Sequence, residues 1–193
     1  MHISHPGGQL FLFFLTVVVA ALSVFVVRER YFIHEKKMIR IVTDLGYIDL
    51  QMCEDEAPIT STHFKKLIEK QLYNGSSFYR SDFVIQGGLR TPEGKPITNP
   101  FEDIPKNEAT LPKALSNRRG TVSVGHWDVP DCGNSEFFIS LKDNPHLDKA
   151  YGGYAVWARV KDDKSLRVVD AIAKAILTKK HVAIEKIILV EDA

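Results

Sequence analysis

The chain has 193 residues, of which 45% are hydrophobic and 25% are charged, and its formal net charge at pH 7 is +1. This length suits one folded domain with a full core, and the composition is that of a globular protein rather than a disordered or repetitive one. The charge forms no long basic run, so no nucleic-acid partner is expected, and two cysteines alone supply neither a disulfide framework nor a four-ligand zinc site.

An uncharged apolar segment, residues 10–27, follows a short tail of residues 1–9. As a helix it would be about 27 Å long, close to the hydrocarbon thickness of a bilayer. We therefore predict a single-pass transmembrane anchor that contacts the lipid bilayer. A cleaved signal peptide is the alternative, because Ala20, Ala21 and Ser23 loosely satisfy a signal-peptidase site, and a buried core helix is a second. The lack of Lys and Arg before the segment favours the anchor.

A charged linker, residues 28–37, leads into the folded domain, which we place at residues 38–193. Residues 38–44 and 46–52 alternate apolar and polar side chains on either side of Leu45-Gly46. This pattern predicts a β-hairpin with one buried face.

Two helices are expected in this domain. The first begins at Pro58 and runs to Asn74-Gly75, which supplies its stop, and the second covers residues 164–176. Each carries an apolar stripe at helical spacing, formed by Phe64, Leu67, Ile68 and Leu72 in the first and by Leu166, Val169, Ile172 and Ile176 in the second.

The remainder of the domain is rich in short strands. Strand-like runs separated by Pro, Gly, Asn and Asp clusters occupy residues 76–80, 83–88, 120–125, 136–141, 154–160 and 183–190. With the hairpin they make about eight strands against two helices, which predicts a mainly β, antiparallel barrel or sandwich. A closed barrel would also remove the exposed strand edges that invite aggregation.

Two clusters of unusual composition are candidates for a site. Arg80 lies among aromatic residues ahead of a Gln-Gly-Gly step, and an arginine in an apolar, β-rich setting needs a partner or a substrate. Phe137 and Phe138 point to opposite faces of a strand, so that one can join the core while the other is available for binding. Taken singly, the clusters also fit a solvated arginine and two ordinary packing aromatics.

The order and spacing of the two clusters resemble the signatures of the cyclophilin family of peptidyl-prolyl cis-trans isomerases. The matching segments are Phe78-Tyr79-Arg80, Phe83-Val84-Ile85-Gln86-Gly87-Gly88, Gly120-Thr121, Ser135-Glu136-Phe137-Phe138-Ile139, Leu147-Asp148 and residues 153–160. Residues 104–109 resemble the short-loop, bacterial-type branch of that family.

The resemblance implies a closed eight-stranded antiparallel β-barrel capped by two α-helices, with a groove on its outer wall for Pro-containing segments of client proteins. It implies Arg80 as the catalytic residue and Gln86 as its support, and neither metal nor cofactor. The residues that it places in contact with the substrate are Phe83, Phe138, Leu147, Tyr154, Tyr79, His126 and Glu136.

Several positions depart from the family pattern. Tyr79 and His126 alter the groove, and Glu136 replaces a glutamine, so we expect a carboxylate near Arg80 whose ion pair either orients the arginine or competes for it. His146 stands where cyclosporin-sensitive members carry tryptophan, so we expect weak binding of cyclosporin.

Two functions fit these residues. Retention of the arginine, the glutamine and the groove phenylalanine favours an active isomerase that assists the folding of client proteins. The altered groove keeps a second candidate, a catalytically weak, membrane-tethered binding module for Pro-containing peptides.

The side of the membrane is indicated by two conflicting signals. Lys and Arg follow the apolar segment and none precedes it, which by the positive-inside tendency predicts a cytoplasmic domain. Secretory routing of similar family members and the glycosylation sequon Asn74-Gly75-Ser76 favour the lumenal side, which we take as the hypothesis.

Overall fold

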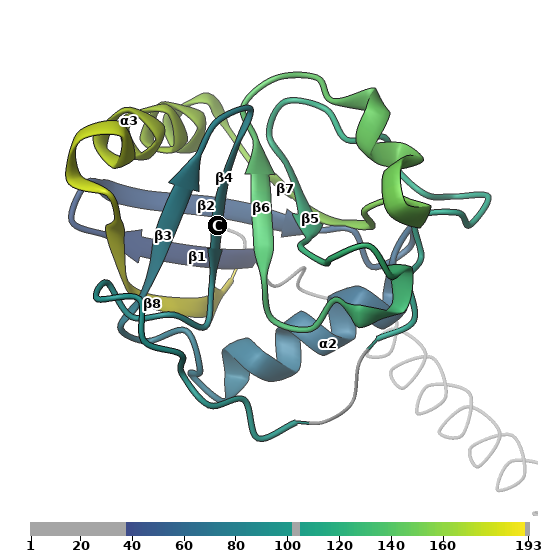
Figure 1. Cartoon of the computed structure of the whole chain (residues 1–193), viewed down its shortest axis with the longest axis horizontal. Helices are drawn as coiled ribbons and strands as arrows, with labels where there is room; N and C mark the ends of the chain where they lie inside the picture. The colour runs from purple at the N-terminus through teal and green to yellow at the C-terminus, as the bar shows by residue number, and fades with distance from the viewer. Residues whose placement is uncertain (1–37, 102–104, 192–193) are drawn as a thin grey trace, which may run out of the picture. The chain divides into compact units, whose positions relative to one another are not determined.

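The structure is a computed structural model that describes residues 38–101 and 105–191. These residues form a closed antiparallel barrel in the order β1-β2-β7-β5-β6-β4-β3-β8 (Figure 1). The strands are β1 (Met38–Thr43), β2 (Gly46–Met52), β3 (Ser76–Ser81), β4 (Val84–Gly88), β5 (Thr121–Val124), β6 (Phe137–Ser140), β7 (Val156–Val160) and β8 (Val182–Val190). Each lies within its predicted range or one residue beyond it, and the barrel rather than the sandwich is confirmed.

Two α-helices, α2 (Pro58–Glu69) and α3 (Asp163–Lys179), lie on opposite sides of the barrel (Figure 1). From α2, the Phe64 ring stacks on Trp157 of β7, with ring centroids 4.2 Å apart. From α3, Val169 and Ile172 are buried in the same apolar core. The barrel interior is therefore filled by side chains, and a ligand must bind on its outer wall.

The first turn of the barrel depends on Gly46, which has a φ of +125°. The Thr43 hydroxyl donates a hydrogen bond to the Gly46 carbonyl at 2.8 Å and closes the predicted hairpin. A Cβ at position 46 would lie 3.0 Å from a methyl group of Val168, so α3 packs directly against this turn.

Helix α2 ends earlier than predicted. It stops at Glu69, and Gln71 has a φ of +56°, whereas Asn74-Gly75 forms the turn that enters β3. The buried Tyr73 gives the physical reason, because on a continuing helix it would lie on the face opposite the buried Phe64 and point away from the core. Helix α3 is confirmed and extends three residues beyond the predicted Ile176, to Lys179.

No helix among the residues described here is long and apolar enough to cross a membrane. The predicted anchor at residues 10–27 lies outside those residues, as do the tail at 1–9 and the linker at 28–37.

The N-terminus of α2 is capped by a residue distant in the sequence. Ala57 at the N-cap position offers no side-chain acceptor, but the buried Glu108 accepts hydrogen bonds from the N–H groups of Ile59 at 3.1 Å and Thr60 at 2.7 Å. A carboxylate there satisfies two backbone donors and complements the positive end of the helix. Glu108 thus fastens the loop that contains it to α2.

Replacing Glu108 should destabilise the barrel measurably. We expect Glu108→Ala to lower the free energy of unfolding by about 1–3 kcal/mol, because two N–H groups lose their acceptor. Glu108→Gln should lose less, since it retains one carbonyl oxygen. Urea unfolding of the full chain measures both, with the exposed Glu69→Ala in the last turn of the same helix as the matched control. Equal stability of Glu108→Ala and Glu69→Ala would show that the cap contributes nothing.

Candidate functional site

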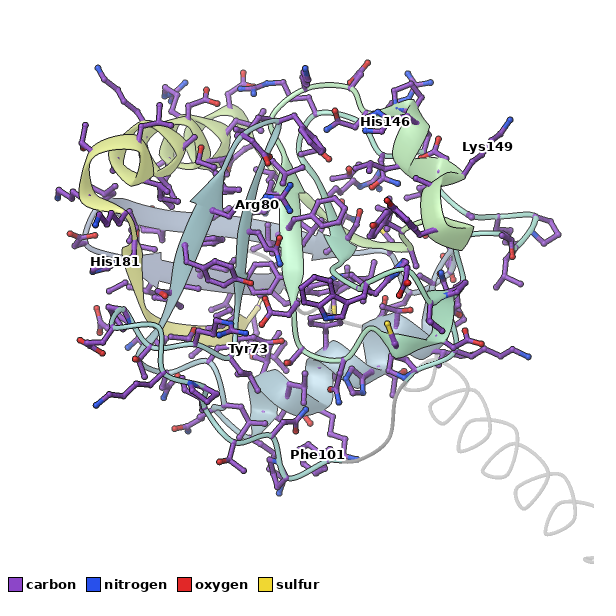
Figure 2. All side chains as sticks on the ribbon, in the orientation of Figure 1. Tyr73, Arg80, Phe101, His146, Lys149 and His181 are labelled. Atoms are coloured by element: carbon purple, nitrogen blue, oxygen red, sulfur yellow. The ribbon has the colours of Figure 1, made fainter. Side chains whose placement is uncertain are left out.

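The strand register brings the candidate residues into one row on the outer wall. Arg80 of β3 pairs with Gln86 of β4, and Gln86 pairs with Phe138 of β6. Because side chains alternate along a strand, their neighbours Ile85, Phe137 and Ile139 point into the barrel and are buried in its core. Figure 2 shows Arg80 near the middle of this wall.

Arg80 is held at two points while about half of its side chain remains exposed. One terminal nitrogen, Nη1, donates to Oε1 of Gln86 at 3.0 Å. The Nε and Nη2 atoms contact Oδ2 of Asp82 at 2.8 and 2.7 Å, and Oδ1 of Asp82 accepts from the Val84 N–H across the β3–β4 turn. Since each terminal nitrogen carries two N–H groups, donors remain available to a ligand in the groove.

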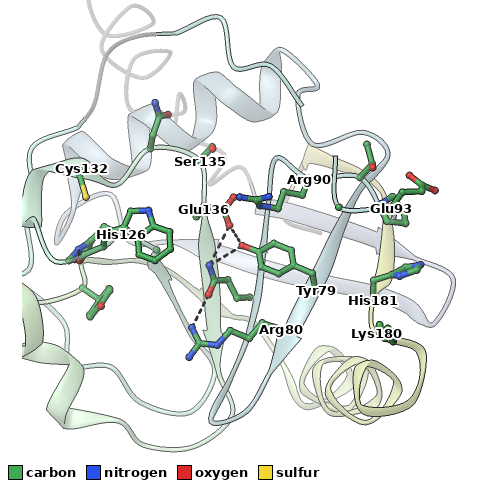
Figure 3. A pocket seen from close by; sticks show the side chains of 18 of the residues that line it. Tyr79, Arg80, Arg90, Glu93, His126, Cys132, Ser135, Glu136, Lys180 and His181 are labelled. Carbon is green, nitrogen blue, oxygen red and sulfur yellow. Dashed lines mark hydrogen bonds between the residues drawn. The ribbon is translucent and has the colours of Figure 1, made fainter. Parts of the chain in front are cut away.

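The orientation of the Gln86 amide is set by two acceptors. Its Nε2 donates to the Tyr79 hydroxyl at 2.9 Å and lies 3.4 Å from the Glu136 carboxylate, which leaves Oε1 facing Arg80 (Figure 3). Tyr79 in turn donates its hydroxyl proton to Glu136. Burial, together with this hydrogen bond, raises the pKa of Tyr79 well above its usual range, so the phenol remains a donor at neutral pH.

The prediction of an ion pair between Glu136 and Arg80 is wrong. Glu136 reaches Arg80 only through Tyr79 and Gln86, and the carboxylate that pairs with Arg80 belongs to Asp82. Glu136 lies over Gly88, where any Cβ would collide with its carboxylate. The glycine therefore makes room for the acidic side chain beneath the groove.

An apolar pocket adjoins the arginine. Val84, Phe138 and Leu147 are buried in a cluster separate from the barrel core, with Phe83 and Tyr154 packed against it. Phe137 and Phe138 do point to opposite faces, but the outer one is also nearly covered, being 5% exposed. The Phe83 ring centroid lies 5.8 Å from the Arg80 guanidinium carbon, so charge and apolar surface meet at one place.

His126 joins the groove to the loop that precedes β7. Its ring stacks on Tyr154 with centroids 4.2 Å apart and an interplanar angle of 19°. Its Nδ1 lies 2.7 Å from the Trp127 carbonyl oxygen and its Nε2 lies 2.9 Å from the Gly153 carbonyl oxygen. These contacts fix Tyr154 at the groove edge.

The structure thus brings all nine predicted site residues to one face, in the groove and its adjoining pocket. Sequence reasoning missed Asp82 and Trp127, which also belong to this face. The spacing of Asp82, two residues after Arg80 at a strand end, was a usable signal. Trp127 offered none, because its neighbourhood depends on how the loop after β5 folds.

The arrangement has a definite chemical character. A charged donor stands beside an apolar pocket, which suits a ligand with an apolar ring next to an atom that accepts a hydrogen bond. Among the residues that the structure describes, no group of three or more His, Cys, Asp or Glu side chains could hold a metal ion.

The sequence matches a known protein family and several of its members. Residues 38–191 match the family described as cyclophilin type peptidyl-prolyl cis-trans isomerase/CLD. A peptidyl-prolyl cis-trans isomerase of Acinetobacter baylyi is 35% identical over 142 residues, covering 70% of this chain and 71% of the relative. Peptidyl-prolyl cis-trans isomerase A of Dickeya dadantii is 32% identical over 165 residues, covering 83% of each.

Solved structures show the same fold at lower identity. A crystal structure of a cyclophilin type peptidyl-prolyl cis-trans isomerase of Cryptosporidium parvum superposes with a TM-score of 0.65 at 22% identity, covering 81% of this chain and 99% of the other. A second structure of that protein, in the presence of the dipeptide Ala-Pro, gives a TM-score of 0.62 at 20% identity, covering 80% of this chain and 99% of that one.

Proposed function

Because the chain belongs to the family of cyclophilin-type peptidyl-prolyl cis-trans isomerases, we propose that Arg80 and its groove perform the rotation of X-Pro bonds. The protein is a peptidyl-prolyl cis-trans isomerase that assists folding. One observation carries the assignment of its site: Arg80, fixed by Gln86 and Asp82, keeps free N–H groups beside an apolar pocket.

The reaction requires a donor rather than a nucleophile. Amide resonance sets the barrier to X-Pro rotation at about 18–20 kcal/mol. As the C–N bond twists, the prolyl nitrogen becomes pyramidal and regains its lone pair, so it accepts a hydrogen bond that the planar amide cannot. A donor that binds this nitrogen only in the twisted state lowers the barrier. We assign that role to Arg80, whose guanidinium is charged at every relevant pH.

The apolar pocket holds the other part of the substrate. In this proposal, Phe138 and Leu147 bind the pyrrolidine ring, with Phe83 and Tyr154 at the edges of the pocket, while the preceding carbonyl swings. The use of dipeptide Ala-Pro with the Cryptosporidium protein supports a Pro-containing ligand for this groove. The separation of Glu136 from Arg80 favours the active enzyme over the catalytically weak binding module, because Glu136 does not form an ion pair with the arginine.

Removing the guanidinium should abolish most of the activity. We expect Arg80→Ala to lower kcat/KM by at least about 100-fold, the usual effect of deleting a transition-state donor. The melting temperature should barely change, because the side chain is half exposed. Exchange NMR with a Pro-containing peptide and the full chain measures the rate, with the exposed Arg159→Ala on β7 as the control. Arg80→Ala with wild-type activity would refute the mechanism.

Glu136 should act through Gln86. We expect Glu136→Ala to lower kcat by about tenfold, equivalent to about 1.4 kcal/mol, with little change in KM, because the Gln86 amide loses one of the acceptors that orient it. Glu136→Gln retains an acceptor for Tyr79 and should lose less. Glu185→Ala, which removes an exposed carboxylate of β8 outside the groove, is the control. An increase in kcat for Glu136→Ala would instead indicate that the carboxylate opposes catalysis.

Cyclosporin should bind weakly. His146 lies edge-on to Phe83, with centroids 5.5 Å apart, and lacks the indole N–H and much of the apolar area of tryptophan. We expect His146→Trp to tighten binding in calorimetric titration. Nanomolar binding by the unmodified chain would show that His146 supports tight binding without an indole.

Membrane attachment and membership of the bacterial-type branch complete the proposal. We infer a single-pass anchor at residues 10–27 from its apolar length. The bacterial origin of the two relatives described above supports the branch. The exposed position of Asn74 in the turn before β3 is compatible with glycosylation on the lumenal side.

The location of the domain can be tested directly. We expect the full chain, expressed in a eukaryotic cell, to shift in mass on glycosidase treatment and to resist added protease in sealed membranes. Asn74→Gln should remove the mass shift and leave the protease protection. An unglycosylated domain that is digested without detergent would place it on the cytoplasmic side.

A further inference from the structure

Large apolar side chains stand exposed at the edge of the groove. Trp127 is 83% exposed, Tyr151 is 61% exposed and Val129 is 55% exposed, and Pro130 beside them is also exposed. Tryptophan is usually well covered in folded proteins, and clusters of exposed apolar side chains commonly mark interaction sites. We call Trp127, Val129, Pro130 and Tyr151 the aromatic rim.

The rim is a built surface formed by two loops. A side chain at Gly152 would collide with Pro130, so the loop containing Tyr151 packs directly on the loop containing Trp127. The Gly153 carbonyl accepts a hydrogen bond from Asn107 at 2.8 Å and lies 2.9 Å from Nε2 of His126. These contacts hold the two loops together beside Tyr154.

The backbone at Tyr151 is held in an uncommon conformation. Its φ of +53° lies in the left-handed region, which residues other than glycine seldom occupy. Such a conformation persists where the surrounding structure enforces it, and it commonly accompanies ligand-binding sites. Here it presents an aromatic ring to solvent instead of burying it.

The rim is continuous with the catalytic groove. One cavity of about 1290 Å³ is lined by Arg80, Gln86 and Tyr154 and also by Trp127 and Tyr151. Pockets for small ligands usually have volumes of about 300–1,000 Å³, so this space exceeds the needs of a single proline ring. A longer peptide segment that contacts Arg80 can therefore extend over the rim.

We propose that the aromatic rim binds an aromatic or large aliphatic side chain of the client, a few residues from the proline that is isomerised. The enzyme then selects Pro-containing segments whose apolar side chains are exposed, and unfolded proteins present such segments. This inference rests on the proposed function of the Arg80 groove. The occupant is a client segment rather than a bilayer or a second copy of the chain, because Trp127 and Tyr151 line the same cavity as the catalytic arginine.

The test compares matched peptides with the full chain. Each peptide contains one proline and either Phe or Ser at one position, scanned over three residues on each side. Exchange NMR without a coupling protease gives kcat/KM. At one or more positions we expect Phe to exceed Ser by at least fivefold. Trp127→Ser and Tyr151→Asn should reduce that ratio to near one, and asparagine tolerates the left-handed backbone at position 151. Leu177→Ser, at a 74% exposed leucine of α3, is the matched control and should retain it.

Several outcomes would overturn the proposal. The first is a Phe-to-Ser ratio of kcat/KM near one at every position in the wild type. The second is a ratio that both rim substitutions leave unchanged. The third is a reduction of the ratio in Leu177→Ser as large as in the rim variants. If the ratio survives while the rim variants bind phosphatidylcholine vesicles or self-associate less than the wild type, a bilayer or a second copy occupies the rim instead.

Failure of the proposed function would look different. If the wild-type chain turns over none of the peptides, the Arg80 mechanism fails. The rim is then judged by the equilibrium dissociation constants of the Phe and Ser peptides, followed through the fluorescence of the exposed Trp127. A Phe preference of at least fivefold that disappears in Tyr151→Asn supports the rim, and equal constants refute it.

Discussion

The antiparallel register of β3, β4 and β6 is the constraint on which the site depends. It sets Arg80, Gln86 and Phe138 in one row on the outer wall while the alternate residues fill the barrel. A slip of one residue would turn this row inward and expose the core residues. Closure of the barrel makes such a slip costly, because every strand is paired on both sides. The stability of the barrel and the placement of Arg80, Gln86 and Phe138 therefore depend on the same strand pairing.

Within that row, the polar contacts give direction to a flexible side chain. The contacts with Gln86 and Asp82 restrict the rotamers of Arg80 before any ligand binds. Binding then costs less side-chain conformational entropy. The Gln86 amide is itself oriented by Tyr79 and Glu136. The Glu136 carboxylate accepts a hydrogen bond from the Tyr79 hydroxyl, whereas Arg80 pairs with Asp82.

The loops around the barrel add what the strands do not. Glu108 fastens its loop to the start of α2, and Asn107 next to it bonds to the Gly153 carbonyl at the edge of the groove. One short segment thus links helix capping with the loop that presents Tyr151. The strands carry Arg80 and Gln86, whereas the loops carry Trp127 and Tyr151 at the edge of the same cavity.

The sequence by itself determined the strands, the two helices and the row of site residues, because alternation, helical spacing and three ordered family motifs are local patterns. It did not determine the end of α2, where burial of Tyr73 overrode the Asn-Gly stop, or the partner of Glu136. Nor did it reveal the exposure of Trp127. These features depend on contacts between segments far apart in the chain, such as Tyr79 with Glu136 and Pro130 with Gly152. Such contacts exist only after the barrel has closed, so the tertiary structure alone decided them.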